Sequence, residues 1–240
     1  MAMIVPHQLR KKTHVPHTLI RAKDILLMFK CSSKFVGGPN DLAGKYPQMN
    51  HTKFLVERSQ RYLHYSVNGI EPTVKVSDYA ENLSRSMPVA DFVEQTAKNK
   101  ALAVASQLNP NEYDIIMGCD TVIVLDGEII GKPRDIDDAR RTLKRLSNRT
   151  HEVFTGVALI EANNCELFHE RTSVKFGPIP DAVIEQYVRS GEPLGRAGSY
   201  GIQAAGAMFV ESIDGCFYNV VGLPAHQVAK RLWLRDTKPH

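Results

Sequence analysis

From residue 53 onward, hydrophobic positions along the chain alternate between a strand pattern and a helix pattern. Runs rich in β-branched residues, bounded by Asn, Asp and Gly, predict strands. The predicted strands cover residues 54–56, 115–125, 128–130, 151–160 and 165–176. Asp126-Gly127 predicts a tight hairpin turn, and the last two predicted strands lie on either side of Asn163-Asn164.

Four stretches predict helices. Pro88 is suited to a first helical turn and opens a helix that is expected to reach about Leu108. Asp135 is expected to cap a second helix. The apolar positions of that helix recur at helical spacing, at Ile136, Ala139, Leu143 and Leu146. Two further helices are expected, one over residues 180–189 and one from Pro224.

A second hairpin is predicted over residues 208–221, with its turn at Asp214-Gly215. Strands that are joined by hairpins and also alternate with helices indicate an α/β protein with a mixed sheet. Residues 1–50 follow neither periodicity, so they are interpreted as a basic N-terminal extension or linker. Residues 51–236 are expected to form one domain of ordinary length.

Composition and charge narrow the class of protein. Of the 240 residues, 43% are hydrophobic and 23% are charged, which is typical of a globular protein with a sizeable core. The longest apolar run, residues 25–29, is far shorter than the roughly 20 residues of a membrane-spanning helix. The net charge is +4, but residues 1–50 contribute +6 and the remainder −2. Nucleic-acid binding through this basic segment is therefore the least favoured class of function.

The cysteines indicate a reducing compartment. The four of them lie far apart and form no C-x-x-C pair, which argues against a zinc site or a disulfide framework. The first residues lack the long apolar segment of a secretory signal. A cytoplasmic location is expected, with a mitochondrial transit peptide in the basic segment as the alternative.

Asp120 is the strongest candidate for a chemical role. It stands in the middle of the apolar run 115–125, where an unpaired carboxylate would be costly. Lys132 follows the 126–127 turn in the returning strand, so a hairpin would bring it near Asp120. A carboxylate that holds Mg²⁺ or activates water, beside a lysine that neutralises phosphate oxygens, suits a phosphate ester. A structural ion pair is the alternative for the two residues.

Two further segments could hold a ligand. Glycines are dense in residues 200–206, which allows close approach of the backbone, and Gln203 can both donate to and accept from a base edge. Residues 219–224 are interpreted as a strand entering a helix whose N–H groups could bind phosphate. For both segments, the alternative to ligand binding is an ordinary turn or connection between secondary-structure elements.

Six motifs, in sequence order, resemble those of the Maf family of nucleoside triphosphate pyrophosphatases. They are GCDTV (118–122), GKP (131–133), TGV (155–157), GEP (191–193), AGSYGIQ (197–203) and NVVGLP (219–224). The resemblance covers about residues 53–234. Within the family, the chain is similar to the branch that acts on dTTP and UTP. It also resembles the Maf-like domain that animals carry fused to an acetylserotonin methyltransferase-like domain.

The resemblance implies metal-assisted hydrolysis of a nucleoside triphosphate to its monophosphate and pyrophosphate, with Mg²⁺ or Mn²⁺ as the metal. Asp120 matches the family's proton acceptor, and Glu81 matches the acid expected to share the metal with it. Lys100 and Lys132 match phosphate-facing lysines, with ordinary surface charge as their alternative. The family fold implies an elongated mixed sheet flanked by helices, with two lobes and a central cleft, related to the inosine triphosphate pyrophosphatase type.

The resemblance also implies the substrate range and the assembly. Thr121 and Gln203 match residues typical of the dTTP and UTP branch, with CTP or modified pyrimidine nucleotides as related substrates. An amide such as that of Gln203 can pair with O4 and N3–H of thymine or uracil. Maf proteins are commonly dimers, so a homodimer is expected, with a nucleoside triphosphate as the small-molecule partner and no membrane partner.

The N-terminal motif departs from the family pattern Ser-x-Ser-Pro-Arg-Arg. Ser59 and Arg61 match it as expected substrate-binding residues, but Glu57 replaces the first serine and Tyr62 the second arginine. An added carboxylate repels a triphosphate, and one lost guanidinium contact corresponds to about 1.5 to 3 kcal/mol. Two hypotheses follow. The retained acids and lysines favour an active enzyme, and the altered motif favours a catalytically impaired nucleotide-binding protein.

Overall fold

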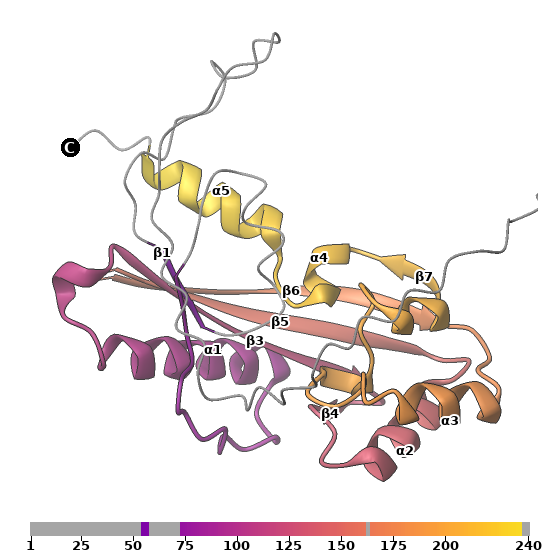
Figure 1. Cartoon of the computed structure of the whole chain (residues 1–240). Helices are drawn as coiled ribbons and strands as arrows, with labels where there is room; N and C mark the ends of the chain where they lie inside the picture. Colours follow the sequence, from indigo (N-terminus) through magenta and orange to yellow (C-terminus); the bar gives the residue numbers. More distant parts are fainter. Residues whose placement is uncertain (1–53, 58–72, 162–163, 237–240) are drawn as a thin grey trace, which may run out of the picture.

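The computed structural model describes residues 54–57, 73–161 and 164–236, which form a mixed sheet flanked by helices (Figure 1). Within these residues the sheet has seven strands, in the order β2-β1-β3-β5-β6-β7, with β4 paired to β3. The strands are β1 (Phe54–Glu57), β2 (Thr73–Lys75), β3 (Ile115–Leu125), β4 (Glu128–Ile130), β5 (Thr150–Glu161), β6 (Asn164–Phe176) and β7 (Val210–Asp214). β1 is parallel to β2 and β3, and the other pairs are antiparallel. The predicted α/β class with a mixed sheet is confirmed.

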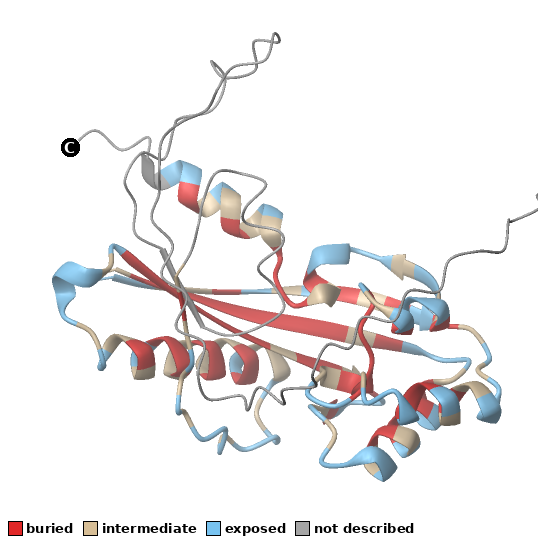
Figure 2. Ribbon diagram, in the orientation of Figure 1, coloured by how far each residue is buried: buried red, intermediate tan, exposed pale blue. Residues whose placement is uncertain are grey.

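Three long strands give the sheet its elongated form. β3, β5 and β6 contain 11, 12 and 13 residues, and much of their length is buried (Figure 2). The turn between β3 and β4 has positive φ at both Asp126 and Gly127. This is the geometry of a two-residue hairpin turn, so the predicted hairpin is confirmed. The connection at Asn163-Asn164 falls partly outside the described residues, and the two lobes with a central cleft stay a prediction.

Helix α1 (Val89–Ala105) covers one face of the sheet (Figure 1), within the range predicted for it. It lies close to the strands because two of their positions carry no side chain. A Cβ at Gly118 would lie 2.1 Å from the carbonyl oxygen of Ala97, and one at Gly156 would lie 2.3 Å from that of Val93. The backbone of α1 therefore rests directly on the middle of β3 and β5.

Helices α2 (Ile136–Leu146) and α3 (Asp181–Arg189) pack together beside one end of the sheet. The predicted cap is confirmed, because the Asp135 carboxylate accepts a hydrogen bond from the Asp138 N–H at 2.7 Å. Three of the four predicted apolar positions are buried, namely Ala139, Leu143 and Leu146. Ile136 is exposed, since it lies in the first turn, beyond the edge of the buried stripe. Three short 3₁₀ helices also occur, η3 (Pro110–Glu112), η4 (Ala197–Ser199) and η5 (Ala205–Phe209).

Helices α4 (Phe217–Val221) and α5 (Ala225–Asp236) lie on the face opposite α1 (Figure 1). The second predicted hairpin is wrong in its returning half. β7 pairs with β6, but residues 217–221 are helical. The start of the segment 219–224, for which the sequence predicts a strand entering a helix, is therefore helical as well. The physical reason is the amide of Asn219, which is fully buried and donates to the carbonyl oxygen of Val153 and to Thr172 Oγ1. These tertiary contacts override the local strand pattern.

The last helix begins directly after Pro224, as predicted. Gly222, with φ of 111°, ends α4 in the left-handed conformation that favours glycine. No helix in the part of the chain that the structure describes is long and apolar enough to span a membrane.

Candidate active site

Asp120 lies at the centre of β3, on the face that α1 covers. Its partner across the ladder to β5 is Gly156. Because side chains alternate along a strand, Asp120 shares the α1 face with Gly118, whereas Thr121 belongs to the opposite face. Asp120 is only 6% exposed, so its carboxylate needs a partner inside the protein.

Lys100 is that partner. It lies among the buried residues of α1, next to Ala101, and is only 5% exposed. Its ammonium group donates to Asp120 Oδ1 at 2.8 Å and lies 2.7 Å from Glu81 Oε1. The alternative interpretation of Lys100 as an ordinary surface charge is therefore wrong, because the side chain enters the sheet–helix interface.

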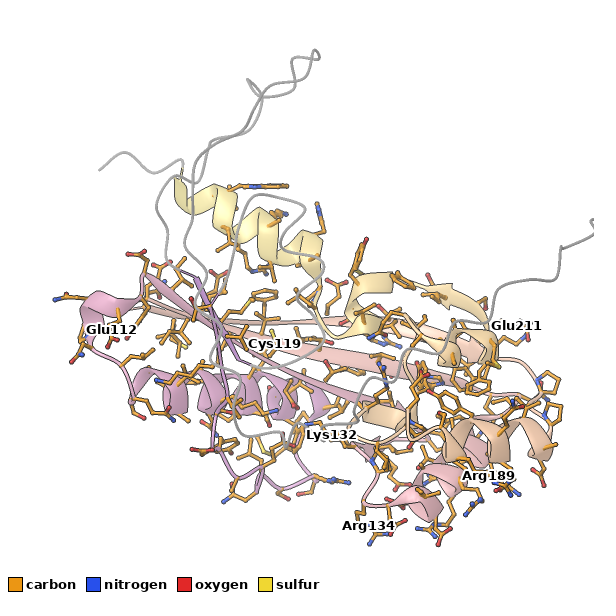
Figure 3. All side chains as sticks on the ribbon, viewed as in Figure 1. Glu112, Cys119, Lys132, Arg134, Arg189 and Glu211 are labelled. Atoms are coloured by element: carbon orange, nitrogen blue, oxygen red, sulfur yellow. The ribbon has the colours of Figure 1, made fainter. Side chains whose placement is uncertain are left out.

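Glu81 and Lys132 extend this arrangement toward solvent. Glu81 lies in the loop between β2 and α1, and Lys132 Nζ is 3.7 Å from Glu81 Oε1. Both side chains are about half exposed. Burial alone raises the pKa of Glu81, but the charges and hydrogen bonds of Lys100 and Lys132 outweigh it and hold that pKa below its usual value. Figure 3 shows Lys132 on the same side of the sheet as α1.

The structure thus brings four of the predicted site residues together. We call Glu81, Lys100, Asp120 and Lys132 the acid–lysine cluster. Lys132 reaches Glu81, and Lys100 links Glu81 to Asp120, so the expected approach of Lys132 to Asp120 takes the form of a chain of ion pairs. The cluster runs from a buried carboxylate to an exposed ammonium group, which suits general-base chemistry at one end and phosphate binding at the other.

Glu81 and Asp120 are the two carboxylates of the cluster that could hold a divalent metal. Glu81 Oε1 and Asp120 Oδ1 both lie within 2.8 Å of Lys100 Nζ, which occupies the position between them. Among the described residues, no group of three or more His, Cys, Asp or Glu side chains is placed to hold a metal. Mg²⁺ is usually bound by one or two carboxylates together with substrate phosphates. A metal at this pair would therefore need further ligands, which substrate phosphates can supply.

Thr121 lies on the opposite face of β3 from Asp120. Its Oγ1 is 3.0 Å from Thr155 Oγ1, and the Thr155 hydroxyl donates to the carbonyl oxygen of Asn219 at 3.0 Å. The hydrogen shared by the two hydroxyls therefore comes from Thr121. Asp120 and Thr121 are adjacent in sequence, yet their side chains lie on different faces of the sheet. The Thr121 hydroxyl is oriented by Thr155, which in turn donates to the main chain of α4.

Gln203 is exposed on the segment between η4 and η5. The start of this segment is joined to the end of β4, because the Gly198 N–H donates to the carbonyl oxygen of Gly131 at 3.0 Å. Lys132 is the next residue. Gly198 has φ of 66°, and a Cβ there would lie 2.6 Å from Ile123 Cδ1, so only glycine fits this crossing. The segment that carries Gln203 is thus anchored beside one end of the acid–lysine cluster.

His151 and Tyr200 form a buried contact that was not predicted from the sequence. His151 Nε2 lies 2.8 Å from the Tyr200 hydroxyl, and both rings meet Phe176 edge-on. Burial lowers the pKa of His151 to about 4, so the imidazole is neutral at physiological pH. The signal was present in the sequence, since His151 is in step with the inward-facing Val153 and Val157 of the same strand.

The altered N-terminal motif lies mostly outside the described residues. This holds for Ser59, Arg61 and Tyr62. Glu57 is the last residue of β1. In the parallel ladder, its neighbour Val56 pairs with Met117, three residues before Asp120 on β3. The backbone of β1 therefore ends beside β3, near the Asp120 of the acid–lysine cluster.

Comparison with known proteins assigns the family. The profile of the Maf-like protein family matches residues 58–234. A dTTP/UTP pyrophosphatase of Bacillus cytotoxicus is 43% identical over 159 residues, which cover 66% of this chain and 82% of the relative. For a dTTP/UTP pyrophosphatase of Ruminiclostridium cellulolyticum, the identity is 45% over 159 residues, with coverages of 65% and 81%. One of Symbiobacterium thermophilum is 43% identical over 164 residues, with coverages of 68% and 83%. The chain belongs to the Maf-like protein family.

Proposed function

We propose that the protein hydrolyses nucleoside triphosphates, dTTP and UTP in particular, to the monophosphate and pyrophosphate. The observation that carries the proposal is the acid–lysine cluster. In it, the buried Asp120 carboxylate binds the Lys100 ammonium group, and Glu81 connects Lys100 to Lys132 at the surface. The relatives named dTTP/UTP pyrophosphatase support the same reaction and substrate class.

In this reaction Asp120 is the general base. Lys100 binds its Oδ1, so the carboxylate is held in place and its second oxygen can accept a proton from water. The water oxygen forms a bond to the α-phosphorus, the bond from that phosphorus to the bridging oxygen breaks, and pyrophosphate leaves. Lys132, and Lys100 behind it, stabilise the negative charge that gathers on the phosphates.

Glu81 and Asp120 would hold Mg²⁺ or Mn²⁺ together with substrate phosphate oxygens. When bound, such an ion neutralises the phosphates and polarises the phosphoryl oxygens. Lys100 lies between the two carboxylates, so it keeps them close together while their negative charges would otherwise repel. Ser59 and Arg61 are the proposed further contacts to the triphosphate.

Gln203, on the segment between η4 and η5, is the proposed pyrimidine contact. Support comes from the junction of this segment with the end of β4, which joins the main chain near Gln203 to the residue before Lys132. Thr121 is proposed as a second specificity residue on the resemblance alone, since its hydroxyl lies on the face of β3 opposite Asp120 and donates to Thr155. Residues 51–236 are the proposed catalytic domain, in a homodimer. The proposed location is cytoplasmic.

The test is pyrophosphate release by the full chain with Mg²⁺ or Mn²⁺, measured for dTTP, UTP, CTP, GTP and 7-methyl-GTP. Asp120→Asn keeps the size of the side chain, and Lys100 keeps its ion pair with Glu81, so the variant is expected to fold with some loss of stability. It should lose about 10²- to 10⁴-fold in turnover, because the amide cannot accept the proton from water. Asp126→Asn, at the exposed hairpin turn, is the matched control and should retain the wild-type rate. Nucleotide binding without pyrophosphate release from the folded wild-type protein would instead support the impaired alternative, in which Glu57 and Tyr62 disable catalysis.

A further inference from the structure

Glu192 and Tyr187 hold the main chain on both sides of Gln203. The two carboxylate oxygens of Glu192 accept hydrogen bonds from the N–H groups of Ala205, at 3.3 Å, and Gly206, at 3.4 Å. The Tyr187 hydroxyl donates to Glu192 Oε1 at 3.0 Å and accepts from the Gly201 N–H at 3.3 Å. Three main-chain amides that flank Gln203 therefore end on one carboxylate–phenol pair, which we call the loop clamp.

The loop clamp is itself fixed by the fold. Tyr187 is buried at the end of α3, and its ring meets Phe209 edge-on with the centroids 4.9 Å apart. Burial and the hydrogen bond to Glu192 raise the pKa of Tyr187, so the phenol keeps its proton and remains a donor. The Arg196 guanidinium donates to the carbonyl oxygen of Glu192 at 3.1 Å, which fixes the backbone from which the carboxylate extends.

The clamped segment also leaves no room for side chains at its glycines. A Cβ at Gly201 would lie 2.3 Å from Arg196 Nη1, and one at Gly206 would lie 2.8 Å from the Gly201 nitrogen. The segment is therefore folded tightly back on itself, with Gln203 at its exposed part. Together with the bond from Gly198 to Gly131, the loop clamp sets where Gln203 stands relative to Lys132.

We propose that Glu192 and Tyr187 are positioning residues for nucleobase selectivity, acting through the main chain on either side of Gln203. This inference rests on the proposed function, with Gln203 as the contact to the base. A fixed main chain limits how far the Gln203 amide reaches into the site, which distinguishes a small pyrimidine from a larger purine. A loosened chain lets the amide move back and admits both.

The experiment has a structural and a functional readout on the full chain. Tyr187→Phe keeps the buried ring and removes only the hydroxyl, and Glu192→Ala removes both acceptors. Each is expected to speed hydrogen exchange at the amides of Gly201, Ala205 and Gly206. Each should also lower the preference for dTTP over GTP, measured as the ratio of their Kd values in EDTA, by roughly tenfold, the factor that corresponds to one hydrogen bond. With dTTP and metal, KM should rise while kcat stays close to that of the wild type.

Two further variants separate positioning from general damage. Glu192→Gln retains one acceptor oxygen and should recover part of the selectivity. Glu185→Gln, on the same helix α3, loses its ion pair with Arg140 but does not touch the clamped segment, so its selectivity should match the wild type.

Each of three outcomes overturns the inference. If amide exchange is unchanged in both Tyr187→Phe and Glu192→Ala, the loop clamp does not hold the main chain. If exchange becomes faster but the Kd ratio is unchanged, the loop clamp has no role in selectivity. The same conclusion follows if the wild-type protein binds dTTP and GTP with equal affinity. A wild-type protein that prefers dTTP but releases no pyrophosphate refutes the proposed hydrolysis and leaves this inference standing.

Discussion

Lys100 Nζ lies 2.8 Å from Asp120 Oδ1, and both side chains are more than nine-tenths buried. A buried carboxylate and a buried ammonium group stabilise each other, but either one alone would be a charge removed from water. The position of the proposed general base is therefore coupled to the stability of the α1–β3 interface. We therefore expect stability and the proposed catalysis to depend on the same contact.

Replacing Lys100 by methionine is expected to destabilise the protein by about 3–5 kcal/mol, because it leaves Asp120 buried without this partner. The double variant Lys100→Met/Asp120→Asn should recover part of that loss, since no charge then remains in the interface. Urea unfolding of the single and double variants measures both effects.

Lys98→Met is the control for helix propensity and for loss of one positive charge. Lys98 lies on the same helix but is only half-buried. Its substitution should change the free energy of unfolding by less than about 0.5 kcal/mol. If Lys98→Met and Lys100→Met cost the same, the contact with Asp120 contributes nothing specific.

Much of the fold could be predicted because its signals are local. The Asp-Gly turn, the apolar run of β3 and the cap at Asp135 each depend on a few neighbouring residues, and all three are confirmed. The helix at residues 217–221 could not be predicted, because a strand-like sequence is held by the amide of Asn219 in contact with β5 and β6. Long-range contacts of this kind produce no periodic pattern of hydrophobic residues in the sequence.

The candidate site shows the same division. Asp120 was identifiable as an acid inside an apolar strand, and the resemblance to the Maf family then brought in Glu81, Lys100 and Lys132. Spacing alone could not show that Lys100 is buried, since a lysine on a helix is mostly exposed. Glu192 is recognisable in the sequence as part of the GEP motif (191–193). Its hydrogen bonds to amides 13 and 14 residues away become evident only in three dimensions.

Gly156→Ala is expected to destabilise the protein by about 3 kcal/mol or more and to lower turnover. The added methyl group would lie 2.3 Å from the Val93 carbonyl oxygen, so α1, which carries Lys100, must move away from β5. Thermal unfolding and pyrophosphate release measure the two effects. In Gly177→Ala the methyl group has its nearest neighbour at 3.9 Å, so this control should be neutral. A neutral Gly156→Ala would show that α1 does not need this close approach.

His151 makes stability depend on pH. Burial lowers its pKa in the folded state to about 4, from 6.5 in the unfolded chain. The unfolded state therefore binds the proton more readily, so the contribution is complete above pH 6.5 and is lost as pH falls from 6.5 to about 4. The loss is on the order of 3 kcal/mol. Urea unfolding across this range measures the slope.

His151→Gln should flatten that slope, whatever its effect on the absolute stability. His226→Gln removes an exposed imidazole on α5 and should retain the wild-type slope. A wild-type slope in His151→Gln would mean that other groups carry the pH dependence between pH 4 and 6.5.

Glu81 is expected to contribute to the acid limb of activity. Burial raises the pKa of Glu81, but the combined effect of Lys100 and Lys132 is larger and opposite, so this pKa lies below 4.5. The carboxylate is ionised above that pKa, and activity is lost as pH falls through it. Lys132→Gln removes one of the two opposing charges and should move the acid limb of kcat/KM to higher pH. Lys144→Gln, which loses only an ion pair with Asp181, should leave the limb in place. An acid limb that is the same in all three proteins would mean that Lys132 does not control the ionisation of Glu81.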